Sequence, residues 1–361
     1  MATLTMRLRT PDTHIPVVCG RHLWPEVTAF LAVELPGHRV AVIADDTVAE
    51  LHGEAAREAL ARGDREPLFL TFPAGETSKS RAEKARLEDA LLDAGAGRDT
   101  AILALGGGVT GDLAGFVAAT LHRGVPLVHL PTSLLAQVDS GIGGKVGINH
   151  PTGKNLIGAF YQARAVFADT AWLDTLPDVE FSNGMAEVIK YAVILDDELW
   201  GWLEDQADAL LARDPVVLDM VIARCMALKA RVVEADEREG GYRSILNWGH
   251  TVAHAIEQLA RYRVRHGFAV AAGMRVAARL SERLLGYPGD RVARLETLIV
   301  RYGLTGVSPA DYDRDQLWER MTRDKKARRA VPRFTLMRRP GEPALFHAVE
   351  KRDLYDALDV S

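Results

Sequence analysis

The chain has 361 residues, 48% of them hydrophobic and 26% charged, and a formal net charge of −5. This length is enough for two domains that each bury a core, and the composition is ordinary for a globular enzyme. The acidic balance gives no reason to expect nucleic acid or an anionic membrane as a partner. No apolar signal segment or membrane-length apolar run occurs, and Cys19 and Cys225 lack CxxC spacing. We therefore expect a cytoplasmic protein without disulfides, zinc knuckles or membrane spans.

The first strand and helix are predicted over residues 38–44 and 48–61. The strand is an apolar, β-branched run, and Asp45 follows it directly. A carboxylate at the carboxyl end of a parallel strand either holds a ribose hydroxyl or caps the next helix, and the cap is the simpler interpretation.

A polar loop, PAGETSKS, lies between an apolar run at residues 67–72 and an amphipathic helix predicted over residues 81–94. It contains Glu76 and Lys79. The loop is either a solvated turn or a nucleotide contact, in which Glu76 accepts from a ribose and Lys79 helps to hold the nucleotide. Its position after a strand permits the second interpretation.

A glycine turn organises the middle of the N-terminal half. The apolar run 101–105 predicts a buried strand, Gly106 to Gly108 follow it, and a helical pattern begins at Leu113, after Asp112. Glycines let the backbone approach a phosphate, and the start of a helix favours an anion. The sequence GGGVTGD does not have the G-x-G-x-x-G spacing, so a tight turn without a ligand is the alternative.

More polar residues follow this turn. Asp139, Lys145, Lys154 and Asn155 lie among five glycines. Lysines among so many glycines predict a mobile loop that holds anionic groups.

A further strand is predicted over residues 125–130. Thr132 and Ser133 follow it, where hydroxyls either bind a cofactor or cap a helix, and Arg123 on the preceding turn is either functional or a surface charge. The alternation of strands and helices predicts an α/β domain with a parallel sheet, of the nucleotide-binding kind. Pro177 marks its expected end, so we assign residues 1–178 to this domain.

The sequence changes character at about residue 179. Helical periodicity extends from Phe181 to about Tyr302, which predicts a mainly α-helical second domain over residues 179–361. Glu187 and Lys190 stand three residues apart in its first helix, where an intrahelical ion pair is the simplest explanation of the spacing taken alone.

Four more polar residues recur at steps of four, three and four: Arg243, Asn247, His250 and His254. If one helix extends back to Arg243, all four side chains project from one side of it. Such a stripe is hard to bury without a ligand.

Glu187, His250 and His266 supply one carboxylate and two imidazoles. This is the ligand set of a catalytic divalent-metal site, and zinc, cobalt and iron all suit it. The three residues belong to three predicted helices, so spacing alone does not show that they converge. No glutamate lies between His250 and His254, which argues against a metalloprotease motif.

The chain resembles the 3-dehydroquinate synthases of the sugar-phosphate cyclase superfamily over nearly its whole length. The matching blocks include GGGVTGDLAGFVAAT, LPTSLLAQVDSGIGGKVGINHPTGKNLIGAFYQ, GMAEVIKY, DEREGG, LNWGHTVAHAIE, RHG and DKK, in the family's order. The resemblance implies an N-terminal Rossmann-like domain for NAD, a helical C-terminal domain for the metal, an active site between them, and a homodimer.

Carried over position by position, the resemblance makes Glu187, His250 and His266 the ligands of zinc or cobalt. Around NAD it places Asp45, Glu76, Lys79, Gly107, Gly108, Val109, Gly111, Asp112, Thr132, Ser133, Asp139, Lys145, Lys154, Trp172 and Thr175. Around the sugar phosphate substrate it places Asp139, Lys145, Lys154, Asn155, Lys190, Lys229, Arg243, Asn247, His254, one of Lys325 and Lys326, and Arg123 from the neighbouring subunit. Among these residues it implies a catalytic role for Lys145, Lys190, Arg243, Asn247 and His254.

The implied reaction belongs to the shikimate pathway, which leads to chorismate and the aromatic amino acids. Similar enzymes convert 3-deoxy-D-arabino-heptulosonate 7-phosphate to 3-dehydroquinate and phosphate. The steps are transient oxidation by NAD, phosphate elimination, re-reduction, ring opening and intramolecular aldol closure. NAD is regenerated in each turnover, so the enzyme is a lyase and not a net oxidoreductase.

Two alternatives stay open. An amino-dehydroquinate synthase or another cyclase of secondary metabolism would share almost every motif, although His254 and Asn247 differ from the residues typical of valiolone and deoxy-scyllo-inosose synthases. A glycerol-type alcohol dehydrogenase would share the two-domain plan, but a small uncharged alcohol leaves the many cationic side chains unpaired. One departure from the family pattern is Phe268, where many relatives have glutamate.

Overall fold

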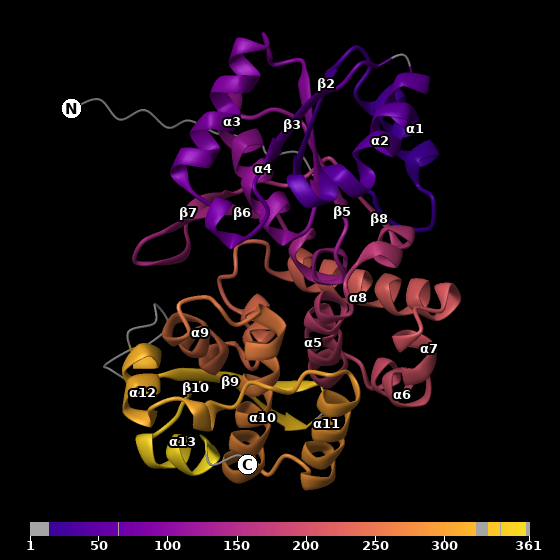
Figure 1. Ribbon diagram of the computed structural model, residues 1–361. Helices are drawn as coiled ribbons and strands as arrows, with labels where there is room; N and C mark the ends of the chain where they lie inside the picture. Colours follow the sequence, from indigo (N-terminus) through magenta and orange to yellow (C-terminus); the bar gives the residue numbers. More distant parts are fainter. Residues whose placement is uncertain (1–13, 64, 323–330, 340, 359–361) are drawn as a thin grey trace, which may run out of the picture.

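The computed structural model describes residues 14–63, 65–322, 331–339 and 341–358. Figure 1 shows a sheet-containing N-terminal part above a mainly helical C-terminal part. Lys325 and Lys326 lie outside the described residues. Within the described ranges, no helix is long and apolar enough to cross a membrane.

The N-terminal part is built on a six-stranded parallel sheet with the strand order β1-β8-β5-β4-β2-β3. Its strands are β1 (Val17–Gly20), β2 (Arg39–Asp45), β3 (Leu68–Phe72), β4 (Thr100–Gly106), β5 (Leu127–Pro131) and β8 (Ala165–Asp169). Its α-helices are α1 (Trp24–Glu34), α2 (Asp46–Arg62), α3 (Arg81–Asp93) and α4 (Gly108–Thr120), and its short helical turns are η1 (Glu76–Ser78), η2 (Leu121–Arg123), η3 (Ala136–Ser140) and η4 (Thr170–Thr175). The predicted α/β fold is confirmed, with α4 starting at Gly108 and not at Leu113.

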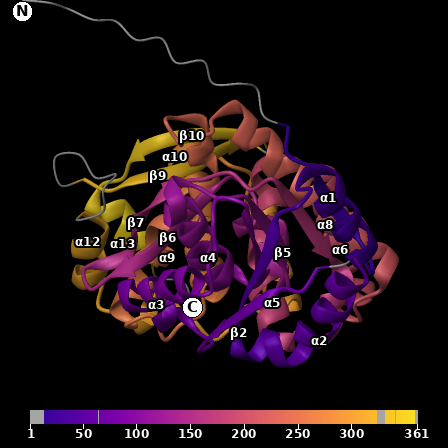
Figure 2. The same ribbon diagram turned by 90° about the horizontal axis from the view of Figure 1, so that it is seen from above.

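Alternation along the strands explains why helices cover both faces of the sheet. In β2, Val40 and Val42 belong to the apolar cluster formed with α1 and α2, whereas Ala41 and Ile43 belong to the cluster formed with α3 and α4. Successive side chains of a strand point to opposite faces, so a continuous apolar run requires helices on both sides. Figure 2 shows α1 and α2 on one side of the strands and α3 and α4 on the other.

The strand order reverses between β2 and β4. From β2 the chain moves outward to β3, then returns to place β4 on the other side of β2. Ligands of open α/β sheets bind beyond the carboxyl ends of strands at such a reversal. Asp45 and Gly106 end these two strands, so the glycine turn occupies the favoured place for a ligand.

The glycine-rich stretch that follows is an ordered hairpin, so the prediction of a mobile loop is wrong. Strands β6 (Lys145–His150) and β7 (Gly153–Phe160) pair antiparallel. The hairpin lies against α4, where Gly115 leaves room for Val146: a Cβ on this glycine would lie 2.4 Å from Val146 Cγ1. Figure 1 shows the hairpin at the edge of the N-terminal part that faces the helices below.

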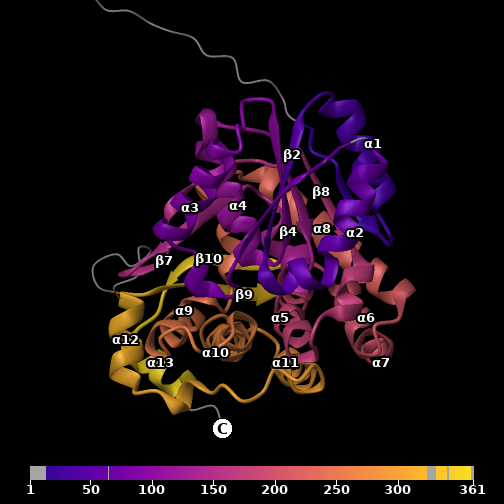
Figure 3. The same ribbon diagram turned by 45° about the horizontal axis from the view of Figure 1, so that its top comes forward.

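The C-terminal part is centred on α10, which contacts α5, α9 and α11; Figure 3 shows α10 between α9 and α11. Its helices are α5 (Asp178–Leu195), α6 (Asp197–Asp205), α7 (Ala207–Leu211), α8 (Pro215–Ala235), α9 (His250–Leu259), α10 (His266–Leu285), α11 (Gly289–Arg301), α12 (Arg314–Thr322) and α13 (Lys351–Leu358), with short turns η5 (Tyr242–Asn247) and η6 (Pro309–Asp311). A hairpin of β9 (Arg333–Arg339) and β10 (Glu342–Ala348), which the sequence did not indicate, packs on α10.

One helix from Arg243 to His254, the condition for a single stripe of four side chains, does not form. Helix α9 begins only at His250, and Arg243 and Asn247 lie in the preceding turn η5. Gly249 lies between η5 and α9 and has a left-handed φ of +80°. A Cβ at this position would lie 2.8 Å from Met274 Cγ and 3.0 Å from Met274 N. Close packing against α10 and a conformation that favours glycine therefore end the turn and start a new helix.

Buried His129 predicts an acid-sensitive step in the stability of the N-terminal part. Burial within β5 lowers the pKa of His129 from 6.5 to about 4. The unfolded chain binds a proton in this range and the folded chain does not, so stability is complete above the unfolded pKa and falls as the pH drops towards 4. We expect His129 to reduce the free energy of unfolding by about 1.5 kcal/mol between pH 6.5 and pH 5.

Urea unfolding of His129→Gln across this pH range measures the effect. In His129→Gln, the free energy of unfolding should fall less between pH 6.5 and pH 5 than in the wild type. His14→Gln, which changes an exposed histidine, should show the same fall as the wild type. Equal slopes for wild type and His129→Gln would contradict the assignment.

Candidate active site

Three polar side chains converge in the C-terminal part. Glu187 lies in α5, and His250 and His266 are the first residues of α9 and α10. One possible ligand atom from each lies within 4.8 Å of the other two. Glu187 Oε1 is 3.4 Å from His250 Nε2 and 3.4 Å from His266 Nε2. The predicted convergence of these residues from three helices is therefore found in the structure.

The second ring nitrogen of each histidine has a partner. His250 Nδ1 lies 3.1 Å from the Trp248 carbonyl oxygen, which can only accept a hydrogen bond. Nδ1 must therefore donate, and burial together with the Lys190 ammonium lowers the pKa of His250 well below its ordinary value. The neutral ring then points the lone pair of Nε2 towards Glu187, an arrangement that needs a cation between them.

Glu187 has no exposed surface, and its Oε2 forms an ion pair with Lys190. Neither carboxylate oxygen has a well-formed hydrogen bond among the described residues. Burial opposes ionisation, but the Lys190 ammonium outweighs it and holds the pKa of Glu187 below its usual range. The carboxylate is thus ionised and lacks hydrogen-bond donors.

These distances fit a divalent ion. Zinc binds imidazole nitrogen and carboxylate oxygen at about 2.0–2.2 Å, and tetrahedral geometry then separates two ligand atoms by about 3.4 Å. The separations from Glu187 Oε1 to both Nε2 atoms have this value. In the metal-free protein, burial would lower the pKa of His266, but the neighbouring carboxylates of Glu187 and Glu257 raise it to about 10, so a proton on His266 takes the place of the cation.

A second charged group lies beside Glu187, His250 and His266. Asp139 Oδ1 accepts from Lys229 Nζ at 2.5 Å and from the Tyr191 hydroxyl at 2.6 Å. Burial would raise the pKa of Asp139, but Lys229 and Lys190 outweigh it and hold the pKa well below its usual range. Asp139, Lys190 and Lys229 are therefore brought together, with Tyr191 as a member that the sequence did not single out.

Arg243, although 1% exposed, leaves part of its guanidinium unpaired. Its terminal nitrogens donate to the carbonyl oxygens of Glu237, at 2.6 Å, and Gly143, at 3.1 Å. Its Nε has no partner among the described residues. Beside it, Glu239 joins Lys145 to Asn247, whose amide donates at 2.9 Å. His254 lies edge-on to His250, with ring centroids 5.5 Å apart.

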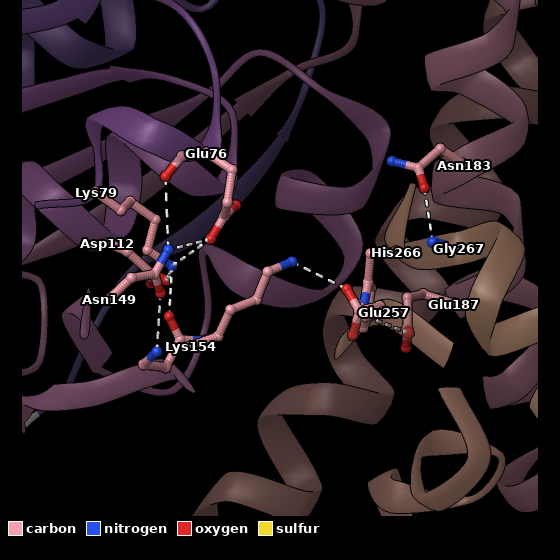
Figure 4. Close-up of polar contacts among 11 residues, drawn as sticks. Glu76, Lys79, Asp112, Asn149, Lys154, Asn183, Glu187, Glu257, His266 and Gly267 are labelled. Atoms are coloured by element: carbon pink, nitrogen blue, oxygen red, sulfur yellow. Dashed lines mark hydrogen bonds and ion pairs between the residues drawn. The ribbon is translucent and has the colours of Figure 1, made fainter. Parts of the chain in front are cut away.

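A second polar group lies on the N-terminal side. Buried Lys79 donates to Asp112 at 2.6 Å and to Asn155 at 2.5 Å, and Asn149 donates to Glu76 at 2.7 Å. Figure 4 shows this group on one side, the metal-ligand group on the other, and Lys154 extending between them to Glu257. The loop that holds Glu76 and Lys79 is therefore bonded to the β6–β7 hairpin.

The glycine turn can hold an anion. No side chain caps α4 at Gly107, so the amide groups of its first turn are available to a ligand. A Cβ on Gly107 would lie 3.3 Å from Ser133 Oγ, and one on Gly108 would lie 2.9 Å from Ser140 Oγ. Backbone and small side chains thus line the end of the sheet.

Comparison with known proteins agrees with this geometry. Residues 69–183 match the family model described as 3-dehydroquinate synthase N-terminal, and residues 184–327 match 3-dehydroquinate synthase C-terminal. A 3-dehydroquinate synthase of Dehalococcoides mccartyi is 45% identical over 343 residues, or 95% of each chain. The chain belongs to the 3-dehydroquinate synthase family.

Solved structures of cyclases have the same fold. A 2-epi-5-epi-valiolone synthase from Streptomyces hygroscopicus subsp. jinggangensis, with NAD+ and Zn2+ bound, is 26% identical, with a TM-score of 0.89 and coverage of 99% of this chain and 98% of that one. A 2-deoxy-scyllo-inosose synthase complexed with carbaglucose-6-phosphate, NAD+ and Co2+ is 30% identical, with a TM-score of 0.84 and coverage of 95% of both chains.

Some residues expected at the site of a 3-dehydroquinate synthase have other partners here. Asp45 caps α2 through Val48 N at 3.0 Å and accepts from Thr110 at 3.2 Å, as the simpler interpretation predicted. Ser133 accepts from Ala136 N at 3.3 Å. Their contacts to NAD stay predictions.

Six more predicted residues lie at the periphery or in packed segments. Trp172 is buried against Trp24, and the Thr175 hydroxyl lies 3.0 Å from His52 Nε2. Val109 packs against the apolar cluster of α3 and α4, and a Cβ on Gly111 would lie 3.5 Å from the His129 ring. Thr132 is buried at the end of β5, and its amide donates to the Gly106 carbonyl oxygen at 3.0 Å. Arg123 is exposed in η2.

Four polar residues of this region were not expected from the sequence: Asn149, Tyr191, Glu239 and Glu257. Glu257 follows His250 by seven residues, two turns along one face of α9, and this spacing could have revealed it. Glu239 and Asn149 lie outside α-helices, in segments whose course depends on tertiary contacts. No periodicity in the sequence points to them.

Packing of α10 on α5 sets the position of His266. The amide of Gly267, next to His266, donates to Asn183 Oδ1 at 2.6 Å (Figure 4). A Cβ on Gly267 would lie 1.9 Å from the Asn183 carbonyl oxygen, which belongs to the backbone of α5. The two helices must therefore separate to accept any side chain here.

We expect Gly267→Ala to lower the free energy of unfolding by about 1–3 kcal/mol and to weaken metal binding, because His266 moves with the helix. Urea unfolding and zinc titration measure both effects. The matched control is Gly201→Ala in α6, where a Cβ meets nothing within 4 Å; it should stabilise by about 0.5–1 kcal/mol. Unchanged stability and zinc affinity in Gly267→Ala would contradict this account.

Proposed function

We propose that this chain converts 3-deoxy-D-arabino-heptulosonate 7-phosphate to 3-dehydroquinate and phosphate, using NAD and a divalent metal held by Glu187, His250 and His266. The charge balance of the buried site carries the proposal. Lys190, Lys229 and Arg243 are buried cations, and Glu187 and Asp139 lie among them. Glu239 also acts on Arg243, but it is paired with a fourth cation, Lys145. A divalent ion brings the net charge of this set to about +3, which a phosphate dianion and one carboxylate balance.

The side chains can hold such a substrate in one conformation. Arg243 Nε offers an unpaired donor, suited to a carboxylate or phosphate oxygen. The Lys229 ammonium is fixed by Asp139, and the Lys145 ammonium and the Asn247 amide are fixed by Glu239. Fixed donors cost little reorganisation as negative charge develops during elimination. When bound, the metal supplies polarisation of a substrate oxygen and NAD supplies reversible hydride transfer.

Two observations support the cofactors. The uncapped start of α4 lies at the strand-order reversal, where a dinucleotide pyrophosphate binds in this class of fold. The solved cyclases similar to this chain contain NAD+ with Zn2+ or Co2+. A small uncharged alcohol would leave the buried cations unpaired, so an alcohol dehydrogenase does not fit the site.

The zinc-loaded protein with catalytic NAD should release phosphate and 3-dehydroquinate in equal amounts, without accumulation of NADH. Phosphate assay, product chromatography and absorbance of NADH test this, with the amino analogue of the substrate run in parallel. Glu187→Ala should lose activity to background, whereas Glu88→Ala, which removes a peripheral ion pair with Lys84, should keep it. NADH formed in proportion to substrate, absence of phosphate release, or exclusive use of the amino analogue would contradict the proposal.

We also propose that the active form is a homodimer in which Arg123 serves the partner's site. Edge strand β7 exposes Leu156 and Phe160, which are 39% and 46% accessible. Exposed apolar edge strands favour pairing with another chain. The turn of Arg123 adjoins the end of this strand, because the Tyr161 hydroxyl donates to the Val125 carbonyl oxygen at 2.7 Å.

A mixing experiment tests the shared site. Arg123→Ala and Glu187→Ala should each be inactive alone, because every site lacks one component. After exchange of subunits, each mixed dimer should contain one intact site and the mixture should recover about a quarter of wild-type activity. Light scattering should give twice the chain mass of 39.5 kDa. A monomer, or a dimer without recovery, would contradict the shared site.

We further propose domain limits at residues 1–178 and 179–361 and a cytoplasmic location. The first limit is supported by the start of α5 at Asp178. The cytoplasmic location is supported by Cys19 and Cys225, which are both free thiols.

A further inference from the structure

Glu257 occupies an unusual position beside the metal ligands. It lies in α9 and is only 3% exposed, and its Oε1 lies 3.5 Å from His266 Nδ1. The same oxygen accepts from Lys154 Nζ at 3.0 Å. One buried carboxylate oxygen therefore contacts both a metal ligand from the C-terminal part and a lysine from the β6–β7 hairpin (Figure 4).

The contact with His266 Nδ1 complements the metal site. A ring nitrogen binds a metal through its lone pair, so the other nitrogen carries the proton and needs an acceptor. For His250 this acceptor is the neutral carbonyl of Trp248. For His266 it is an ionised carboxylate, which fixes the ring orientation and also makes Nε2 a more basic donor to the metal.

We propose that Glu257 is a positioning residue that holds His266 in the metal-binding tautomer and orientation and thereby sets metal affinity. This inference rests on the proposed metal site. Glu257 itself lies behind the ring: Nε2 of His266 faces Glu187 at 3.4 Å, whereas Nδ1 faces Glu257.

Lys154 and His266 both contact Oε1 of Glu257. Glu257 could therefore serve mainly to anchor the hairpin through Lys154 or mainly to position His266, and replacing Lys154 separates these two roles. Lys154 also lies over the Tyr262 ring, with Nζ 4.7 Å from its centroid. If Glu257 mainly anchored the hairpin, loss of Lys154 would reproduce the loss of Glu257. If Glu257 mainly positions His266, the carboxylate interacts with the imidazole without competition once Lys154 is replaced. Metal affinity is then kept or increased.

The test measures metal binding without turnover. Metal-free protein is titrated with Co2+ and with Zn2+ against a chelator, and the visible spectrum of bound cobalt reports its coordination. Glu257→Gln should weaken binding by about 10- to 100-fold and change the cobalt spectrum, because a neutral amide orients the ring less strongly. Glu257→Asp, which restores the charge at a shorter reach, should fall between Gln and wild type.

Two controls separate positioning from other effects. Lys154→Met should bind cobalt at least as tightly as wild type. Glu204→Gln changes a helical glutamate that is paired with Arg294 and Trp200, away from the metal ligands, and should leave both affinity and spectrum unchanged. Thermal unfolding of the metal-free proteins reports whether each variant is folded.

The outcomes are distinct. Wild-type affinity and spectrum in Glu257→Gln would overturn the inference, as would equal losses in Glu257→Gln and Lys154→Met. A Glu257→Gln protein destabilised equally with and without metal would also overturn it, because the carboxylate would then be a general structural element. Failure of the wild type to bind Co2+ or Zn2+ would instead refute the proposed metal site.

Discussion

The buried carboxylate of Glu187 is the constraint on which the helical part depends. A charge without access to water is stable only if other charges or a metal compensate for it. Lys190 contributes one ion pair, and the first residues of α9 and α10 bring two imidazoles to the other oxygen. The packing of α5, α9 and α10 therefore creates a site whose electrostatics require a cation. This explains why glycines stand at the contacts beside both histidines, at Gly249 and Gly267.

The N-terminal part presents its own polar groups to this centre. The strand-order reversal places an uncapped helix start and two glycines at one end of the sheet, while the β6–β7 hairpin extends towards α9. Lys79 fastens this hairpin to α4 through Asp112 and Asn155. A nucleotide bound at the end of the sheet and a sugar phosphate bound at the metal would thus lie next to each other, on either side of Lys154. Oxidation and phosphate elimination on one substrate need such an arrangement.

The sequence predicts most of this organisation, because strand alternation, helical periodicity and the order of motifs are local properties. It predicts the strands ending at Asp45 and Gly106 and the helix of Glu187, whereas the convergence of Glu187, His250 and His266 was implied by the resemblance and not by spacing. It fails where tertiary packing decides. Arg243 and His254 do not share one helix because Gly249 packs on Met274, and the expected mobile loop is a hairpin because Gly115 admits Val146. Glu257 was overlooked because its importance comes from contacts with two other segments.

The coordination of the bound metal shows whether Glu187, His250 and His266 hold it together. X-ray absorption spectroscopy of the zinc-loaded protein distinguishes imidazole nitrogen, carboxylate oxygen and sulfur ligands. We expect two imidazole nitrogens and one protein carboxylate oxygen, with one or more further oxygen ligands from water. In Glu187→Ala the two-imidazole signal should decrease as bound zinc is lost. A sulfur ligand, or a signal with no imidazole, would contradict the account.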